Sequence, residues 1–117
     1  MRLYKINNLS SYSKEEYSIF KEYDYNWGHI SIFPKLSEFF IKKYKNKVNW
    51  QKISANQVLS ESFIKKHKDL VDWYCVFKYQ KLSEKFIEKH KDKADWNAIF
   101  MLRGLSPEFK NKYRKYC

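Results

Sequence analysis

Two of the side chains best suited to acid–base or metal chemistry lie at a fixed interval. His67 and His90 are 23 residues apart, and Tyr44 and Tyr113 occupy the same place one interval earlier and one later. A position that alternates between histidine and tyrosine favours a half-buried aromatic side chain over a metal ligand or a general base. His29 lies outside this series. The histidines therefore predict packing rather than catalysis.

The carboxylates, thiols and glycines do not indicate an enzyme either. Glu61 and Glu84 can be imagined as a catalytic pair, but each follows a serine that is placed to start a helix, so we expect a local capping role. Cys75 and Cys117 have no metal-ligand or redox spacing. With two glycines in total, the chain has no phosphate-binding loop. We expect no catalytic residues, no metal and no cofactor.

The strongest pattern in the sequence is an internal repeat with a period of 23 residues. A fixed period of this kind is typical of stacked repeat architectures. The recurring positions hold tryptophan (Trp27, Trp50, Trp73, Trp96), phenylalanine (Phe40, Phe63, Phe86, Phe109), leucine (Leu36, Leu59, Leu82, Leu105) and serine (Ser37, Ser60, Ser83, Ser106). We expect the tryptophans and phenylalanines to form the core.

Each copy of the repeat predicts a helical hairpin. Ser60 is placed as an N-cap before apolar residues at helical spacing, which predicts a first helix near 60–69. Asp72 can cap a second helix near 73–79. Helices this short need packing against neighbours to be stable. We therefore predict an all-α fold, a short α-solenoid of stacked helical hairpins.

The repeat also predicts the domain organisation, because no linker interrupts it. In the first, degenerate copy, Ser13 begins a capping box and Tyr17 takes the phenylalanine position. We expect a single domain over 1–117, made of an N-terminal cap segment (1–12), a degenerate repeat (13–35), three repeats (36–58, 59–81, 82–104) and a terminal half-repeat (105–117).

The chain is strongly basic, with 24 Lys and Arg, 13 Asp and Glu, and a formal net charge of +11. Stacking aligns equivalent positions, so the sequence predicts two basic ridges on the surface. The first ridge contains Lys43, Lys66, Lys89 and Lys112, and the second contains Lys45, Lys68, Lys91 and Arg114.

Two explanations of these ridges are open at this point. They can attract a polyanion, or they can reflect the composition bias of an A+T-rich genome, with lysine stems covering apolar core. Since three of the basic residues are arginines and the others are lysines, sequence-specific base recognition is not expected.

No membrane segment or export signal is expected. The longest uninterrupted apolar runs have five residues, whereas a membrane-spanning helix needs roughly 20. Residues 1–12 lack the continuous apolar stretch of a secretion signal. We therefore expect a cytoplasmic protein without a membrane partner.

The motif Leu-Ser-Glu-x-Phe-Ile-x-Lys-His-Lys-Asp-x-x-Asp-Trp occurs almost unchanged at 59–73 and 82–96, and loosely at 36–50. It resembles a short helical repeat found in many phage and giant-virus proteins of unassigned function. The resemblance implies an interaction module and brings no catalytic residues with it. Small basic proteins of that origin are often antagonists of host defence, including inhibitors of CRISPR nucleases.

Two functional hypotheses follow. The first is a non-enzymatic binding module, encoded by a phage or virus, that binds a host protein or nucleoprotein such as a nucleic-acid-handling defence complex. The second is direct, sequence-independent binding of RNA or DNA along the lysine ridges.

Overall fold

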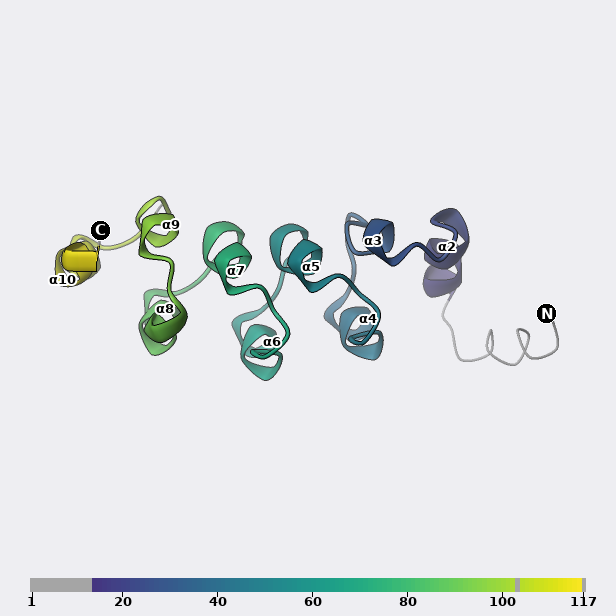
Figure 1. Cartoon of the computed structure of the whole chain (residues 1–117), viewed down its shortest axis with the longest axis horizontal. Helices are drawn as coiled ribbons and strands as arrows, with labels where there is room; N and C mark the ends of the chain where they lie inside the picture. The colour runs from purple at the N-terminus through teal and green to yellow at the C-terminus, as the bar shows by residue number, and fades with distance from the viewer. Residues whose placement is uncertain (1–13, 103, 117) are drawn as a thin grey trace.

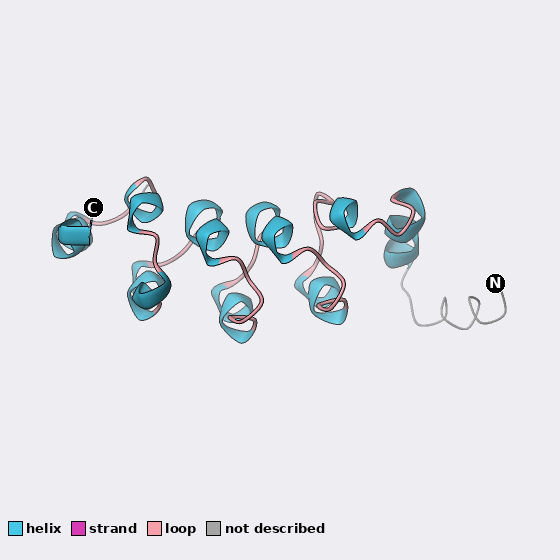
Figure 2. Cartoon of the chain, viewed as in Figure 1, coloured by secondary structure: helices cyan, strands magenta, loops and turns pink. Residues whose placement is uncertain are grey.

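The computed structural model describes residues 14–102 and 104–116, and within these ranges all regular elements are helices, which confirms the predicted all-α class. Figure 2 shows the helices joined by loops. Ser13 with its predicted capping box, the cap segment 1–12 and Cys117 lie outside the described residues. The elements are, in order, α2 (Lys14–Glu22), α3 (Trp27–Ile30), α4 (Glu38–Lys43), α5 (Trp50–Asn56), α6 (Glu61–Lys66), α7 (Trp73–Tyr79), α8 (Glu84–Lys89), η1 (Lys91–Lys93), α9 (Trp96–Phe100), α10 (Pro107–Tyr113) and η2 (Arg114–Tyr116).

The helix starts are set by capping side chains. Ser60 Oγ accepts a hydrogen bond from the Phe63 N–H at 3.1 Å, and the Asp72 carboxylate accepts one from the Cys75 N–H at 3.1 Å. The same kind of bond recurs at the starts of α4, α5, α8, α9 and α10. The predicted caps are therefore confirmed, and each satisfies an N–H of the first turn that has no partner inside its helix.

The first helix of a copy is shorter than predicted. α6 ends at Lys66 instead of near residue 69, and His67 already has a non-helical φ of −113° and ψ of 32°. The Lys68 carbonyl accepts a hydrogen bond from the Trp73 indole N–H at 3.0 Å. This bond replaces a further helical turn with a tight turn that leads into α7.

The helices are arranged in two rows along the long axis of the molecule (Figure 1). We call α3, α5, α7 and α9 the tryptophan row, because each begins with a tryptophan, and α4, α6 and α8 the lysine row, because each ends with a lysine. From α3 to α9 the chain alternates between the two rows, α2 lies beside α3 at one end, and α10 lies at the other end. The principal-axis extents of 61 × 21 × 19 Å describe an elongated molecule.

The core is built from side chains of both rows. The four phenylalanines predicted as core are buried, each at most 7% exposed, and the four tryptophans are half-buried against their edge. The tryptophans thus border the core and do not fill its centre. Six isoleucines are among the innermost side chains and are each 0% exposed: Ile30, Ile41, Ile53, Ile64, Ile87 and Ile99.

The packing of the first helix corrects the sequence prediction for Tyr17. Tyr17 is 37% exposed, whereas Phe20, one turn later in α2, is 2% exposed. The Phe20 ring lies 5.5 Å from the Trp27 ring and 5.9 Å from the Phe40 ring, between centroids. α2 spans 9 residues, against 6 for α4, so the strict interval does not carry over to this helix.

Buried glutamines connect successive copies in a way that the sequence analysis did not anticipate. Gln80, 6% exposed, donates to the Ser54 and Gln57 carbonyl oxygens at 2.8 and 2.6 Å and accepts from the Leu59 N–H at 3.0 Å. Gln57 makes the equivalent bonds one copy earlier, to Ser31, Phe33 and Leu36. We call Gln57 and Gln80 the glutamine ladder; their amides satisfy loop backbone groups that burial would otherwise leave unpaired.

Within the described ranges, no helix combines the length and apolar character that crossing a membrane requires.

Candidate binding surface

His67 and His90 lie in aromatic stacks, as the alternation with tyrosine predicted. The His67 ring centroid is 4.2 Å from that of Phe63, and the His90 centroid is 4.4 Å from Phe86 and 5.1 Å from Trp73. Burial lowers the pKa of His90, and the nearby Lys89, Lys93 and Lys65 ammonium groups lower it further, against an opposing effect of Asp92. His90 is therefore neutral near pH 7.

Glu61 and Glu84 do not face each other. The Glu61 carboxylate accepts hydrogen bonds from the Ser83 N–H at 2.6 Å and the Ser83 hydroxyl at 3.1 Å. Glu84 binds Ser106 in the same way, and Glu38 binds Ser60. The sequence predicted for these glutamates only a role at the start of their own helices. Each carboxylate also binds the N-cap serine of the next copy. We call these contacts the Glu–Ser clamps.

Cys75 is a buried free thiol whose pKa is raised, first by burial and then by Asp72. Among the described residues, no group of three or more His, Cys, Asp and Glu is placed to hold a metal ion.

The first basic ridge is unevenly neutralised. At one end, Lys43 Nζ lies 3.2 Å from an oxygen of Glu16, which is 6% exposed, and at the other Lys112 forms an ion pair with Glu88. In the described part of the chain, Lys66 and Lys89 have no carboxylate within ion-pair distance. The ridge therefore presents free charge in its middle.

The second basic ridge follows the ends of α4, α6, α8 and α10. Its four residues, Lys45, Lys68, Lys91 and Arg114, are all exposed. The carbonyls of Lys45 and Lys68 accept the indole bonds of Trp50 and Trp73. These contacts fix the backbone and leave the ammonium groups in solvent.

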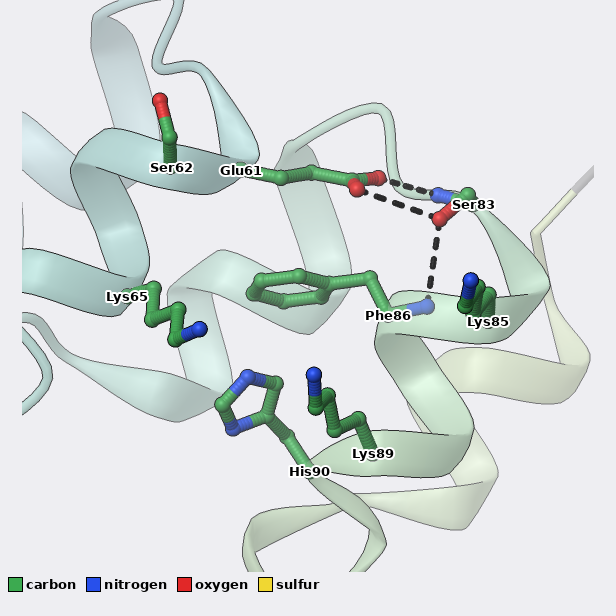
Figure 3. A pocket seen from close by; sticks show the side chains of 8 residues that line it. All are labelled: Glu61, Ser62, Lys65, Ser83, Lys85, Phe86, Lys89 and His90. Carbon is green, nitrogen blue, oxygen red and sulfur yellow. Dashed lines mark hydrogen bonds between the residues drawn. The ribbon is translucent and has the colours of Figure 1, made fainter.

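A hollow of about 190 Å³ lies between α6 and α8, in the middle of the lysine row. Figure 3 shows its side chains: Lys65 and Lys89 extend toward the His90 ring, and Glu61 reaches across to Ser83. Lys85 completes a set of three lysines, whereas the one carboxylate of the lining, Glu61, is already bound by the serine. We call this hollow the cationic notch. Lys65 and Lys85 were not predicted as binding residues from the sequence, because their nearness depends on how α6 and α8 adjoin.

The other copies of the repeat do not reproduce this concentration of charge. One interval earlier, between α4 and α6, the positions of the three lysines hold Lys42, Ser62 and Lys66. One interval later, between α8 and α10, they hold Glu88, Glu108 and Lys112. The repeat thus accepts serine and glutamate at these positions, so stacking does not require the three lysines.

Comparison of the chain with protein-family models, with curated proteins and with solved structures finds no match.

Proposed function

We propose that the chain is a short α-solenoid with a 23-residue repeat that serves as a non-enzymatic binding module for an acidic surface of a macromolecular partner. The two rows of helices, the capping pattern and the glutamine ladder support the solenoid, because equivalent contacts recur between successive copies. The resemblance to phage and giant-virus repeats supports a host protein or nucleoprotein as the partner.

The cationic notch is the observation that carries this proposal. Three lysines gather around one hollow in which the single carboxylate is already hydrogen-bonded. Like charges placed together repel one another, and this repulsion is smaller in the other copies, which hold Ser62 or Glu88 and Glu108 at matching positions. The three lysines are not needed for helix packing, and their mutual repulsion disfavours placing them together. This supports a role in binding anionic groups, which would offset the repulsion.

A matched pair of charge-reversal variants tests the proposal. Lys65, Lys85 and Lys89 are changed to Glu in one variant, and the exposed Lys35, Lys47 and Lys81 in the control, so both have the same net charge. Tagged proteins are incubated with host extract, and retained macromolecules are identified by mass spectrometry and nucleic-acid staining. We expect a stoichiometric protein partner that the control retains and the notch variant loses. Equal retention by both variants, or recovery of nucleic acid alone, contradicts the proposal.

The second candidate is sequence-independent binding of RNA or DNA along the ridges. The observation that favours it is the pair of free lysines, Lys66 and Lys89, at the ends of adjacent helices in one row. A gel-shift titration with single-stranded and duplex oligonucleotides at increasing salt tests it, because phosphate contacts weaken steeply with salt. Absence of binding at low salt, or binding that salt does not change, rules this function out.

A further inference from the structure

A second hollow lies in the other row of the molecule, between α7 and α9 of the tryptophan row. Its volume is about 450 Å³, and Tyr74, Lys78, Tyr79, Met101 and Leu102 contribute to its lining. Tyr74 is 51% exposed, Tyr79 55% and Met101 81%. We call this site the tyrosine hollow. It shares no lining residue with the cationic notch.

Lys78 organises the two tyrosines. Its ammonium nitrogen lies 5.5 Å from the centroid of the Tyr74 ring and 5.3 Å from that of Tyr79. At these distances a cation is attracted by the face of each ring. This shared contact favours an arrangement in which both rings lie beside Lys78, and a binding site that is partly arranged in advance has a lower entropy cost of binding.

The neighbouring copies show that stacking does not need these side chains. The position of Tyr74 holds Gln51 one interval earlier and Asn97 one interval later. Asn56 occupies the position of Tyr79 one interval earlier, and Ala55 that of Lys78. Since polar or small residues serve equally well in the same frame, the exposed aromatic surface at α7 is a local addition to the repeat. Exposed apolar patches of this kind mark interaction sites.

We propose that the tyrosine hollow docks a protein segment that inserts an apolar side chain between Tyr79 and Met101 and places a carboxylate on Lys78. Tyrosine and methionine are enriched in the buried centres of protein interfaces. The lining carboxylate, Asp95, is turned to the Ala98 N–H at 3.0 Å as the cap of α9 and forms no ion pair with Lys78 in the described residues, so the Lys78 ammonium can meet the carboxylate of a ligand. This inference is independent of the function proposed for the cationic notch.

The chemistry of the hollow favours a protein segment over a nucleic acid. Single-stranded nucleic acids bind surfaces that combine open aromatic faces with several cations along the backbone path. Here the hollow holds one lysine, Lys78, near both rings, and the remaining lining includes the apolar Ala98, Met101 and Leu102. A single cation beside an apolar wall matches an acidic group next to an apolar side chain.

A peptide selection tests the proposal with a defined probe. A random dodecapeptide library is selected on the full chain, and enriched peptides are measured by fluorescence anisotropy. The test variant combines Tyr74→Gln and Tyr79→Asn, which restores the residues of the preceding copy, and the control is Phe39→Ser, which removes a 72% exposed aromatic from α4 of the lysine row.

We expect enriched peptides to pair an apolar residue with Asp or Glu, and their affinity to fall at least about tenfold in the double variant but not in the control. Lys78→Ala is expected to lower the affinity for acidic peptides. It should not change the affinity for peptides in which Asp or Glu is replaced by Asn or Gln. The notch charge-reversal variant is expected to bind these peptides like the wild type, which separates this test from that of the proposed function. No enriched peptide, undiminished affinity in the double variant, or displacement of the peptide by oligothymidine overturns the proposal.

Discussion

The tryptophan row and the lysine row share one period but are joined to their neighbours by different contacts. Successive copies of the tryptophan row are connected by the buried amides of Gln57 and Gln80 and by Ser54 Oγ, which accepts the Asp72 N–H at 3.0 Å. Successive copies of the lysine row are connected by the more exposed Glu–Ser clamps. Because a buried polar group costs more free energy when its partner is lost, the tryptophan row fixes the register of the array.

This division explains where the surface is free to vary. In the lysine row, the clamps occupy the helix starts, and the side chains near the helix ends differ in charge from copy to copy. In the tryptophan row, exposed positions vary between copies, such as those of Tyr74 and Tyr79. Both candidate binding sites lie at such variable positions, and the following substitutions separate them from the positions that hold the array together.

The largest expected effect comes from Trp73, which joins the two rows. Its ring contacts Phe77 of its own helix and Phe86 and His90 of the lysine row, and it packs against both core clusters. We expect Trp73→Ala to lower the free energy of unfolding by about 3 kcal/mol, measured by urea denaturation followed by circular dichroism. The adjacent Tyr74→Gln is the control and should change it by less than about 0.5 kcal/mol. Equal effects would mean that the rows do not depend on each other.

The next largest effect tests the glutamine ladder. Gln80→Leu keeps the size of the side chain but leaves the Leu59 N–H and the Ser54 and Gln57 carbonyls without their partner. We expect a loss of about 2 kcal/mol in the free energy of unfolding, because buried groups lose hydrogen bonds that water does not replace. The exposed Gln51→Leu is the matched control. A ladder without structural importance would make the two variants equally stable.

A smaller effect is expected from the lysine row. Glu61→Ala removes the two hydrogen bonds to Ser83 and should lower the free energy of unfolding by about 1 kcal/mol, since these bonds are partly exposed. Glu108 occupies the same place in the last copy, and no serine of a following copy contacts it in the described residues. Glu108→Ala therefore removes only the helix-start contribution, whereas Glu61→Ala removes that contribution and the clamp, so the difference between the two variants measures the clamp. A loss in Glu61→Ala as large as that in Gln80→Leu would remove the distinction between the rows.

Local features of the fold were predictable because they depend on neighbours in the sequence. Ser60 and Asp72 were correctly placed as caps, and Phe63 as a core residue, from spacing alone. The half-burial of the tryptophans was not predicted. It arises because the indole N–H of Trp73 donates a hydrogen bond to the Lys68 carbonyl at the edge of the core. The sequence also did not predict that Phe20 would take the buried position expected for Tyr17, because α2 is longer than the first helix of the other copies.

Contacts between copies were harder to predict than contacts within one. Gln57 and Gln80 are 23 residues apart, but the equivalent positions in the flanking copies hold Pro34 and Arg103. Two glutamines alone did not indicate a repeated contact. For the candidate surface, the ridge positions were predicted, but the ion pairs of Lys43 with Glu16 and of Lys112 with Glu88 were not. Long side chains reach across copies, and which partner they meet depends on how the helices adjoin rather than on the period.

The smallest effect is a pH dependence that belongs to the junction between the rows. His90 Nε2 is buried without a hydrogen-bond partner among the described residues, and burial together with Lys89, Lys93 and Lys65 lowers the pKa of His90. A histidine whose pKa is lower in the folded than in the unfolded chain binds a proton more readily when the chain is unfolded. Its contribution to stability is therefore complete above the unfolded pKa of about 6.5 and is lost as the pH falls below that value. Asp92, which acts in the opposite direction, limits the size of the effect.

His90→Tyr should remove this dependence, because tyrosine already occupies the same position at Tyr44 and Tyr113 and does not titrate in this range. Melting temperatures measured at about pH 8 report the packing change alone, and their further change on acidification to about pH 5.5 reports the histidine. The lowered pKa of Glu88, due first to its hydrogen bond with Lys112, confines its own contribution to more acidic conditions. Acidification to about pH 5.5 should therefore lower the melting temperature more in the wild type than in His90→Tyr. An equal decrease of the melting temperature in both proteins would show that groups other than His90 cause the acid sensitivity.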